Sequence, residues 1–186
     1  GGVLVDEYMR TSCKEVLAAG CCAEVKNGLF GGFDLLTPPS ASLEQGIIAG
    51  YNAAGVRRAY KGALNAFVVQ TPYLEVGGVG LTEEKAVKLG YTPESFSVTC
   101  YDRDLPRGRG VLKAKLLVDR RSGRILGFQA VGWRGVSGYL NLVSLAIRSG
   151  VGLEGLCSLE HAYTPVTSKL YTPLHLLANK ALEVIG

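Results

Sequence analysis

The chain has 186 residues, enough for one domain with a sizeable core or for one domain plus a fragment of another. It is 47% hydrophobic and 19% charged, which is typical of a soluble globular protein, and its net charge of +4 is too small to indicate a nucleic-acid partner. No apolar run reaches about 18 residues, so we expect no membrane-spanning helix and no membrane partner.

The cysteines and histidines argue against two common kinds of site. The five cysteines are odd in number, no pair has the CxxC spacing, and only two histidines are present. Neither a disulfide framework nor a metal site is therefore expected. Reduced thiols are typical of the cytoplasm, which is the predicted location. The cysteines are Cys13, Cys21, Cys22, Cys100 and Cys157.

The first stretch, residues 1–65, begins with apolar runs that suggest a parallel sheet. The runs at 3–5 and 16–19 are typical of strands buried on both faces, and the second ends at Gly20. The chain opens directly on the first run without an initiator Met. We therefore expect it to be a piece of a longer protein.

A helix is predicted next, over residues 42–54. Ser42 and Gln45 have the spacing of a capping box, and Gly55 is placed to end the helix. Its apolar face would consist of Leu43, Ile47, Ile48 and Tyr51.

The second stretch, residues 66–186, has a different pattern, in which strands come first and helices follow. Helices are predicted after Thr82, over residues 137–149, and after Thr172 with Pro173 in the first position. This order predicts an α+β domain with an antiparallel sheet and flanking helices. The expected strands include residues 67–69, 74–80, 96–100, 111–118 and 125–131.

A candidate ligand site follows the second apolar run. Tiny residues there let backbone N–H groups approach a polar ligand at the carboxyl end of a sheet. On chemistry alone the signal is weak, and the pattern favours an ordinary strand end. The residues concerned are Thr11, Ser12, Gly20, Cys21, Cys22 and Ala23.

Several segments resemble, in order and at matching spacing, the C-terminal part of the FAD-dependent pyridine nucleotide-disulfide oxidoreductases. Residues 16–24 are similar to the last FAD-binding motif of that family, and the closest branch contains the coenzyme A-disulfide reductases and NADH oxidases. The resemblance implies that residues 1–65 are the C-terminal portion of an α/β FAD-binding domain and that residues 66–186 are the dimerisation domain. It continues through residues 45–46, 49–55, 60–62, 79–86 and 123–127.

The resemblance also implies FAD and NAD(P)H as cofactors of the full-length protein. The family has an Asp at the position of Cys21, where its carboxylate accepts a hydrogen bond from the ribityl chain of FAD. A neutral thiol is a weak acceptor, so this departure predicts weaker FAD binding or other contacts, and no flavin on the isolated chain. The implied FAD-binding residues are Gly20, Cys21, Cys22, Ala23 and Ser42.

A catalytic role for Tyr163 is implied in the same way. In the coenzyme A-disulfide reductase-like branch, a Tyr at this loop position reaches across a dimer to the partner's active site. A phenol can donate a hydrogen bond to sulfur or oxygen without titrating near pH 7. That branch has a second Tyr in a YxPG-like loop, where this chain has residues 104–108 without Tyr. The alternative is a surface Tyr packed on the last helix.

A homodimer through residues 66–186 is expected from composition as well. The last helix and the strand containing Leu112, Ala114 and Leu116 offer more apolar surface than one small layer can cover.

Two patterns, one glycine-rich and one basic, have two possible interpretations each, phosphate binding or a purely structural role. The glycine-rich residues 77–80 could bind phosphate or simply form a strand. The arginines between 103 and 124 could bind phosphate or simply form a solvated hairpin surface.

Two functions stay open at this point. The resemblance implies transfer of electrons from NAD(P)H through FAD to a small-molecule disulfide, oxygen or a coenzyme A-type acceptor. This piece would supply part of the FAD site and the dimer interface, and it would be inactive alone. The alternative is a non-catalytic dimerisation module that has lost FAD binding, as Cys21 and the missing loop Tyr suggest.

Overall fold

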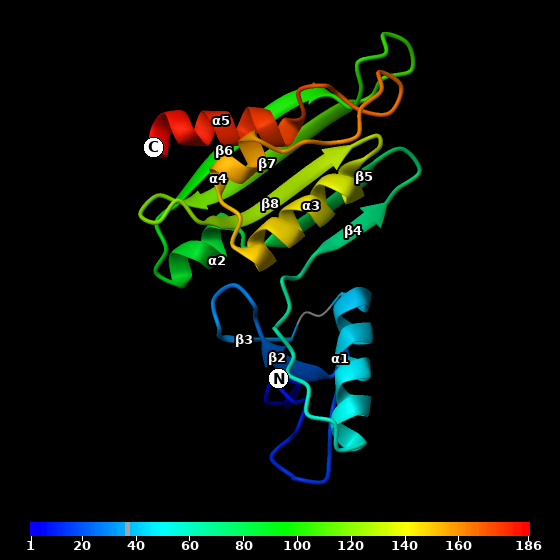
Figure 1. Cartoon of the computed structure of the whole chain (residues 1–186), viewed down its shortest axis with the longest axis vertical. Helices are drawn as coiled ribbons and strands as arrows, with labels where there is room; N and C mark the ends of the chain where they lie inside the picture. Colours follow the sequence, from blue (N-terminus) through cyan, green and yellow to red (C-terminus); the bar gives the residue numbers. More distant parts are fainter. Residues whose placement is uncertain (36–37) are drawn as a thin grey trace. The chain divides into compact units, whose positions relative to one another are not determined.

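The computed structural model describes residues 1–35 and 38–186. The chain divides into two compact units, Gly1–Asn65 and Ala66–Gly186 (Figure 1). Each unit has its own sheet, and each is described by itself below. In the described residues, no helix has the length and apolar character needed to cross a bilayer.

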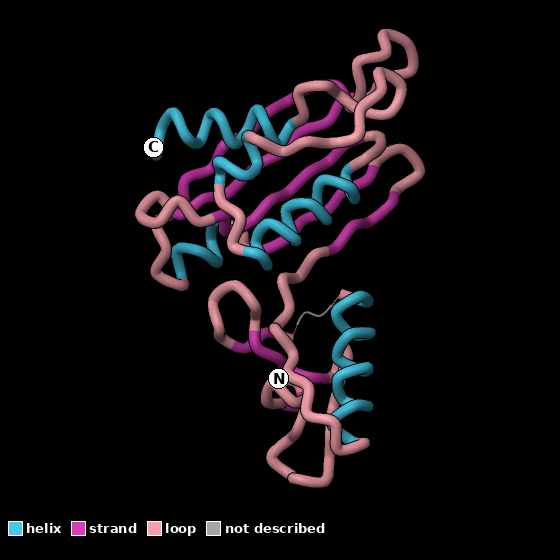
Figure 2. The backbone as a smooth tube through the Cα atoms, in the orientation of Figure 1, coloured by secondary structure: helices cyan, strands magenta, loops and turns pink. Residues whose placement is uncertain are grey.

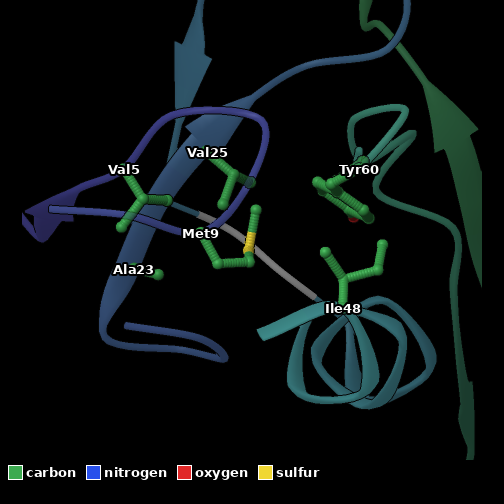
Figure 3. Close-up of a cluster of buried hydrophobic side chains, with 7 residues drawn as sticks. Val5, Met9, Ala23, Val25, Ile48 and Tyr60 are labelled. Atoms are coloured by element: carbon green, nitrogen blue, oxygen red, sulfur yellow. The ribbon is translucent and has the colours of Figure 1, made fainter. Parts of the chain in front are cut away.

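The first unit contains a small mixed sheet and one long helix. Strand β2 (Ala23–Lys26) lies between β1 (Val3–Leu4), to which it is parallel, and β3 (Phe33–Asp34), to which it is antiparallel. Helix α1 (Pro39–Ala53) supplies Ile48 to the core, which is otherwise built by the sheet and loops. Figure 3 shows this cluster, which contains Val5, Met9, Ala23, Val25, Ile48, Tyr60 and Ala63.

The expected strand over residues 16–19 is wrong. Val16 is 49% exposed, and the segment makes only an isolated bridge between Leu17 and Arg10. The backbone N–H of Thr11 donates to the Val16 carbonyl, and that of Ala18 donates to the Met9 carbonyl. The segment therefore satisfies its polar groups in a local turn, and β2, which follows the glycine and cysteines, takes the place beside β1.

The helix prediction was correct in type and in the inward position of Ile48, but wrong about the start of the helix and the rest of its apolar face. The helix begins at Pro39, and the Ser42 amide already donates to the Pro38 carbonyl, so Ser42 does not act as a cap. Gln45 is fully buried, whereas Leu43 and Ile47 are 68% and 49% exposed. A polar side chain takes the inward position because it has a specific hydrogen-bond partner there, described below.

The second unit is built on a five-stranded sheet in which every neighbouring pair is antiparallel. This confirms the predicted α+β domain with an antiparallel sheet. The strand order is β4-β5-β8-β7-β6, so residues far apart in the chain become neighbours. The strands are β4 (Phe67–Gln70), β5 (Glu75–Gly80), β6 (Pro93–Tyr101), β7 (Val111–Asp119) and β8 (Ile125–Gly132).

Two long helices cover one face of this sheet, α3 (Val136–Ser149) over β5 and β8 and α5 (Pro173–Ile185) over β6 and β7 (Figures 1 and 2). The short α2 (Glu83–Lys88) lies against β6, and α4 (Leu153–Cys157) packs on α5. The predicted caps Thr82 and Thr172 are confirmed, because each hydroxyl accepts from the backbone N–H three residues on. The five-residue α4 was not predicted, since it is too short to show a helical period.

The expected contribution of β7 to a dimer surface is wrong. Leu112, Ala114 and Leu116 are at most 4% exposed, because strand alternation turns all three toward the helix-covered face. The opposite face of the sheet carries exposed apolar side chains instead, including Phe67, Val69, Val76 and Val111.

Candidate functional site

In the first unit, the turn through Gly20 lies beside the first turns of α1. Gly20 has a φ of +89°, a left-handed conformation that favours glycine, and its N–H donates to the Gln45 side-chain oxygen at 2.8 Å. The Cys21 Sγ lies 3.9 Å from the Ser42 Oγ. Three of the predicted cofactor-binding residues, Gly20, Cys21 and Ser42, are thus brought together.

The other two predicted residues are placed differently. The Cys22 thiol is exposed and donates to the Ala19 carbonyl at 3.5 Å. Ala23 is fully buried in the core, so its side chain cannot touch a ligand. Its backbone N–H donates to the Gly20 carbonyl at 2.9 Å, which closes the turn.

This turn has only part of the chemistry that a flavin's ribityl chain needs. The small side chains and the exposed start of α1, which has no side-chain cap and no acidic residue in its first turn, leave room for a polar group and attract negative charge. Position 21, however, carries a thiol, which is a weaker acceptor than a carboxylate. The residues present therefore do not supply the charged acceptor for a ribityl hydroxyl.

In the second unit, Tyr163 lies in the loop between α4 and α5, half-buried. Its hydroxyl donates to the Asp104 Oδ2 at 3.1 Å, in the loop between β6 and β7. The same carboxylate accepts from the Lys169 ammonium at 3.0 Å and from the Leu170 backbone N–H at 2.8 Å. Asp104 is therefore the anchor that joins the two loops.

The charges around Asp104 stabilise its ionised form. The backbone hydrogen bond from Leu170 and the bond from Lys169 lower the pKa of Asp104 below its ordinary value. Burial, together with the hydrogen bond to Asp104, raises the pKa of Tyr163. At neutral pH the pair is thus a neutral phenol bound to a carboxylate.

Next to this loop lies a pocket of about 650 Å³ between α3 and the loop, with Arg103, Arg134, Tyr139 and His161 in its wall. Arg103 is not part of a solvated hairpin surface. Its side chain is 12% exposed, it forms an ion pair with Asp102 at 3.2 Å, and its guanidinium lies over the Trp133 ring. Burial raises the pKa of Tyr139 to about 12, so this phenol is neutral as well. Residues 77–80, the other open pattern, lie within strand β5.

Two residues that sequence reasoning missed organise these regions. Gln45 holds the Gly20 turn, whereas the sequence suggested for it only a capping box with Ser42 and a place in the family resemblance. Asp104 holds Tyr163 from 59 residues away, and nothing local in the sequence indicates that contact.

The second unit is therefore an α+β domain in which helices cover one face of an antiparallel sheet. A tyrosine is anchored in the loop before its last helix. The model of the pyridine nucleotide-disulphide oxidoreductase dimerisation domain matches residues 67–173. The chain therefore belongs to the pyridine nucleotide-disulphide oxidoreductase family.

Relatives and solved structures agree with this assignment. The chain is 32% identical over 184 residues to an NADH oxidase of Methanocaldococcus jannaschii, with 98% of this chain and 41% of the relative covered. It is 31% identical to a CoA-dependent NAD(P)H sulfur oxidoreductase of Pyrococcus furiosus, with 96% and 40% covered. A NAD-dependent persulfide reductase from A. fulgidus superposes with a TM-score of 0.92 at 28% identity, with 98% and 34% covered. The chain spans about two fifths of the curated relatives' length.

Proposed function

We propose that this chain is the C-terminal portion of a flavoprotein that passes electrons from NAD(P)H through FAD to a disulfide, oxygen or a coenzyme A-type acceptor. The observation that carries the proposal is the likeness over 98% of the chain, at a TM-score of 0.92, to a NAD-dependent reductase. In this proposal residues 1–65 end the FAD-binding domain, and residues 66–186 form the interface of a homodimer.

FAD, when bound, would accept the hydride and pass on the electrons. The chain's own part is to position groups. The turn at Gly20, Cys21 and Cys22, with Ser42, would lie along the cofactor, and Tyr163 would act at the partner's site. The exposed apolar residues of the second unit support a homodimer, because such surface is normally covered. Light scattering at micromolar concentration checks this, and a monomer would contradict it.

A non-catalytic dimerisation module is the second candidate, and the thiol at Cys21 favours it. The two candidates are separated by expressing the reading frame together with any sequence that precedes Gly1. An electron-transfer enzyme shows a stoichiometric flavin absorbance band and consumes NAD(P)H with oxygen, a disulfide or a polysulfide. A dimer without flavin and without turnover supports the module instead. The isolated 186-residue chain is expected to be colourless in either case.

The cofactor-binding residues are tested by Cys21→Asp in the full-length protein. A carboxylate that accepts a hydroxyl bond contributes about 1.5–3 kcal/mol, so FAD should bind roughly tenfold to a hundredfold more tightly. Cys13→Asp is the matched control, because Cys13 is also exposed but lies outside the Gly20 turn. Equal FAD affinity in the wild type and Cys21→Asp would show that position 21 does not face the ribityl chain.

Tyr163→Phe tests the catalytic assignment by removing only the hydroxyl. If this hydroxyl contacts the reacting group, turnover should fall about tenfold, since a lost hydrogen bond of about 1.4 kcal/mol is one decade in rate. Dimerisation and FAD content should not change.

A further inference from the structure

We infer that the Tyr163 hydroxyl uses its only hydrogen in the bond to Asp104, so that Tyr163 meets its reactant as a hydrogen-bond acceptor and Asp104 acts as a positioning residue. The inference rests on the proposed role of Tyr163. It also names the chemistry of the group that Tyr163 would contact, which is one that carries a hydrogen, such as a thiol or persulfide S–H.

The loop that carries Asp104 is bound to the loop that carries Tyr163 through their backbones. The Asp104 N–H donates to the Ser168 carbonyl at 3.3 Å, and the Leu105 N–H donates to the Pro165 carbonyl at 2.8 Å. The loop that carries Asp104 and the loop that carries Tyr163 therefore run side by side (Figure 2), joined by two backbone bonds to residues that follow Tyr163. This pairing holds the two backbones together, and the Asp104 side chain can turn away only by losing its bonds to Lys169 and Leu170.

The hydrogen bond between Tyr163 and Asp104 has a fixed direction. Asp104 is surrounded by donors, namely the Lys169 ammonium at 3.0 Å and the Leu170 N–H at 2.8 Å, so it is held as a carboxylate. An ionised carboxylate only accepts. The 3.1 Å bond to Tyr163 must therefore use the phenol proton, and the phenol oxygen keeps its remaining lone-pair capacity as an acceptor.

Tyr163 and Asp104 do not form a proton relay. A thiol proton could move to the Tyr163 oxygen only if the phenol proton moved to Asp104 at the same time. The pKa of Asp104 is lowered from an ordinary value near 4, and that of a thiol is about 8.5, so this double transfer is uphill by more than four decades. Tyr163 keeps its proton, and the pair orients the incoming hydrogen without removing it.

The test uses the full-length protein with Tyr163→Phe, Asp104→Asn and the double variant. Asp104→Asn keeps the shape of the side chain but removes the charge that fixes the phenol proton. We expect Asp104→Asn to lower turnover about fivefold to tenfold, and the double variant to be no slower than Tyr163→Phe, because Asp104 acts through Tyr163. Thr167→Ala, which removes a hydrogen bond to Thr164 in the same loop, is the control and should stay within about twofold of the wild type.

A second measurement is independent of turnover. The ionisation of Tyr163 can be followed by ultraviolet absorbance against pH, as the transition that disappears in Tyr163→Phe. We expect this transition to move to lower pH in Asp104→Asn. A merely structural role of Asp104 would not produce this shift in a protein that keeps its dimeric state and circular dichroism spectrum.

The outcomes separate the inference from the proposal beneath it. An Asp104→Asn protein as fast as the wild type, beside a slow Tyr163→Phe protein, would overturn the inference alone and make Tyr163 a donor. An unchanged Tyr163 titration in Asp104→Asn would also overturn it. Wild-type turnover in Tyr163→Phe would remove the proposed role of Tyr163, and the inference with it.

Discussion

The carboxylate of Glu75, the first residue of β5, accepts hydrogen bonds from the backbone N–H groups of Val136 at 2.8 Å and Ser137 at 3.4 Å. These are the first two residues of α3. Gly135, at the N-cap position, offers no side chain to cap the helix, so a strand residue 61 positions before Val136 does so instead. The contact ties the sheet to the helix that covers it.

We expect Glu75→Ala to lower the free energy of unfolding of the second unit by about 1–2 kcal/mol, because the orphan N–H groups and the positive end of the helix dipole lose their partner. The measurement is urea unfolding followed by the fluorescence of Trp133, the only tryptophan in the sequence. Glu84→Ala, which breaks an exposed ion pair with Lys88 in α2, is the control and should cost less than about 1 kcal/mol. Equal effects of the two substitutions would contradict the capping role.

Gly77→Ala should destabilise the second unit by about 1–3 kcal/mol, in the range of overpacked cores. A Cβ at this position would lie 2.4 Å from the Phe67 carbonyl oxygen and 2.5 Å from Leu140 Cδ1, so β4 or α3 must move. Gly138→Ala is the matched control in α3, where an added Cβ meets nothing within 4 Å. This control should stabilise the unit by about 0.5–1 kcal/mol, and thermal unfolding of both variants decides the comparison.

Asp119 makes the stability of the second unit depend on acid pH. Burial opposes its ionisation, but the hydroxyl of Ser122 at 2.6 Å and the N–H of Thr92 at 3.0 Å lower its pKa below the ordinary value. A lowered pKa contributes stability that is present above the unfolded pKa, near 4, and lost as pH falls through the folded pKa.

Asp119→Asn should therefore cost about 1–3 kcal/mol at pH 7, and its difference from the wild type should shrink as the pH falls below about 4. Urea unfolding at several pH values measures both. A difference that stays constant down to pH 2 would show that the charge of Asp119 is not the source of the effect.

The cysteines should differ in reactivity. Burial raises the pKa of Cys100 and of Cys157, whereas Cys13, Cys21 and Cys22 are exposed. Because the thiolate is the reactive form, iodoacetamide at pH 7.5 should modify the three exposed cysteines at least about tenfold faster than Cys100. Mass spectrometry of timed digests gives the rates, and in urea all five should react at similar rates. Fast labelling of Cys100 in the folded chain would contradict its burial.

Features that depend on near neighbours in the chain could be predicted from the amino-acid sequence. Thr82 and Thr172 cap their helices because a hydroxyl reaches an N–H three residues away. The alternation from Phe96 to Cys100 predicted a half-buried strand, since side chains on a strand point to opposite faces in turn. Family-wide spacing of short motifs indicated the sheet domain and the loop that carries Tyr163.

Features that depend on partners far away in the chain could be seen only in the folded structure. Residues 16–19 look like a buried strand, but the place beside β1 is taken by β2. Gln45 is buried because Gly20, 25 residues earlier, donates to it. Asp104 meets Tyr163, and Glu75 meets Val136, only after strands and helices have packed. A hydrogen bond between distant residues leaves no local periodicity, so its partners become visible only when the chain has folded.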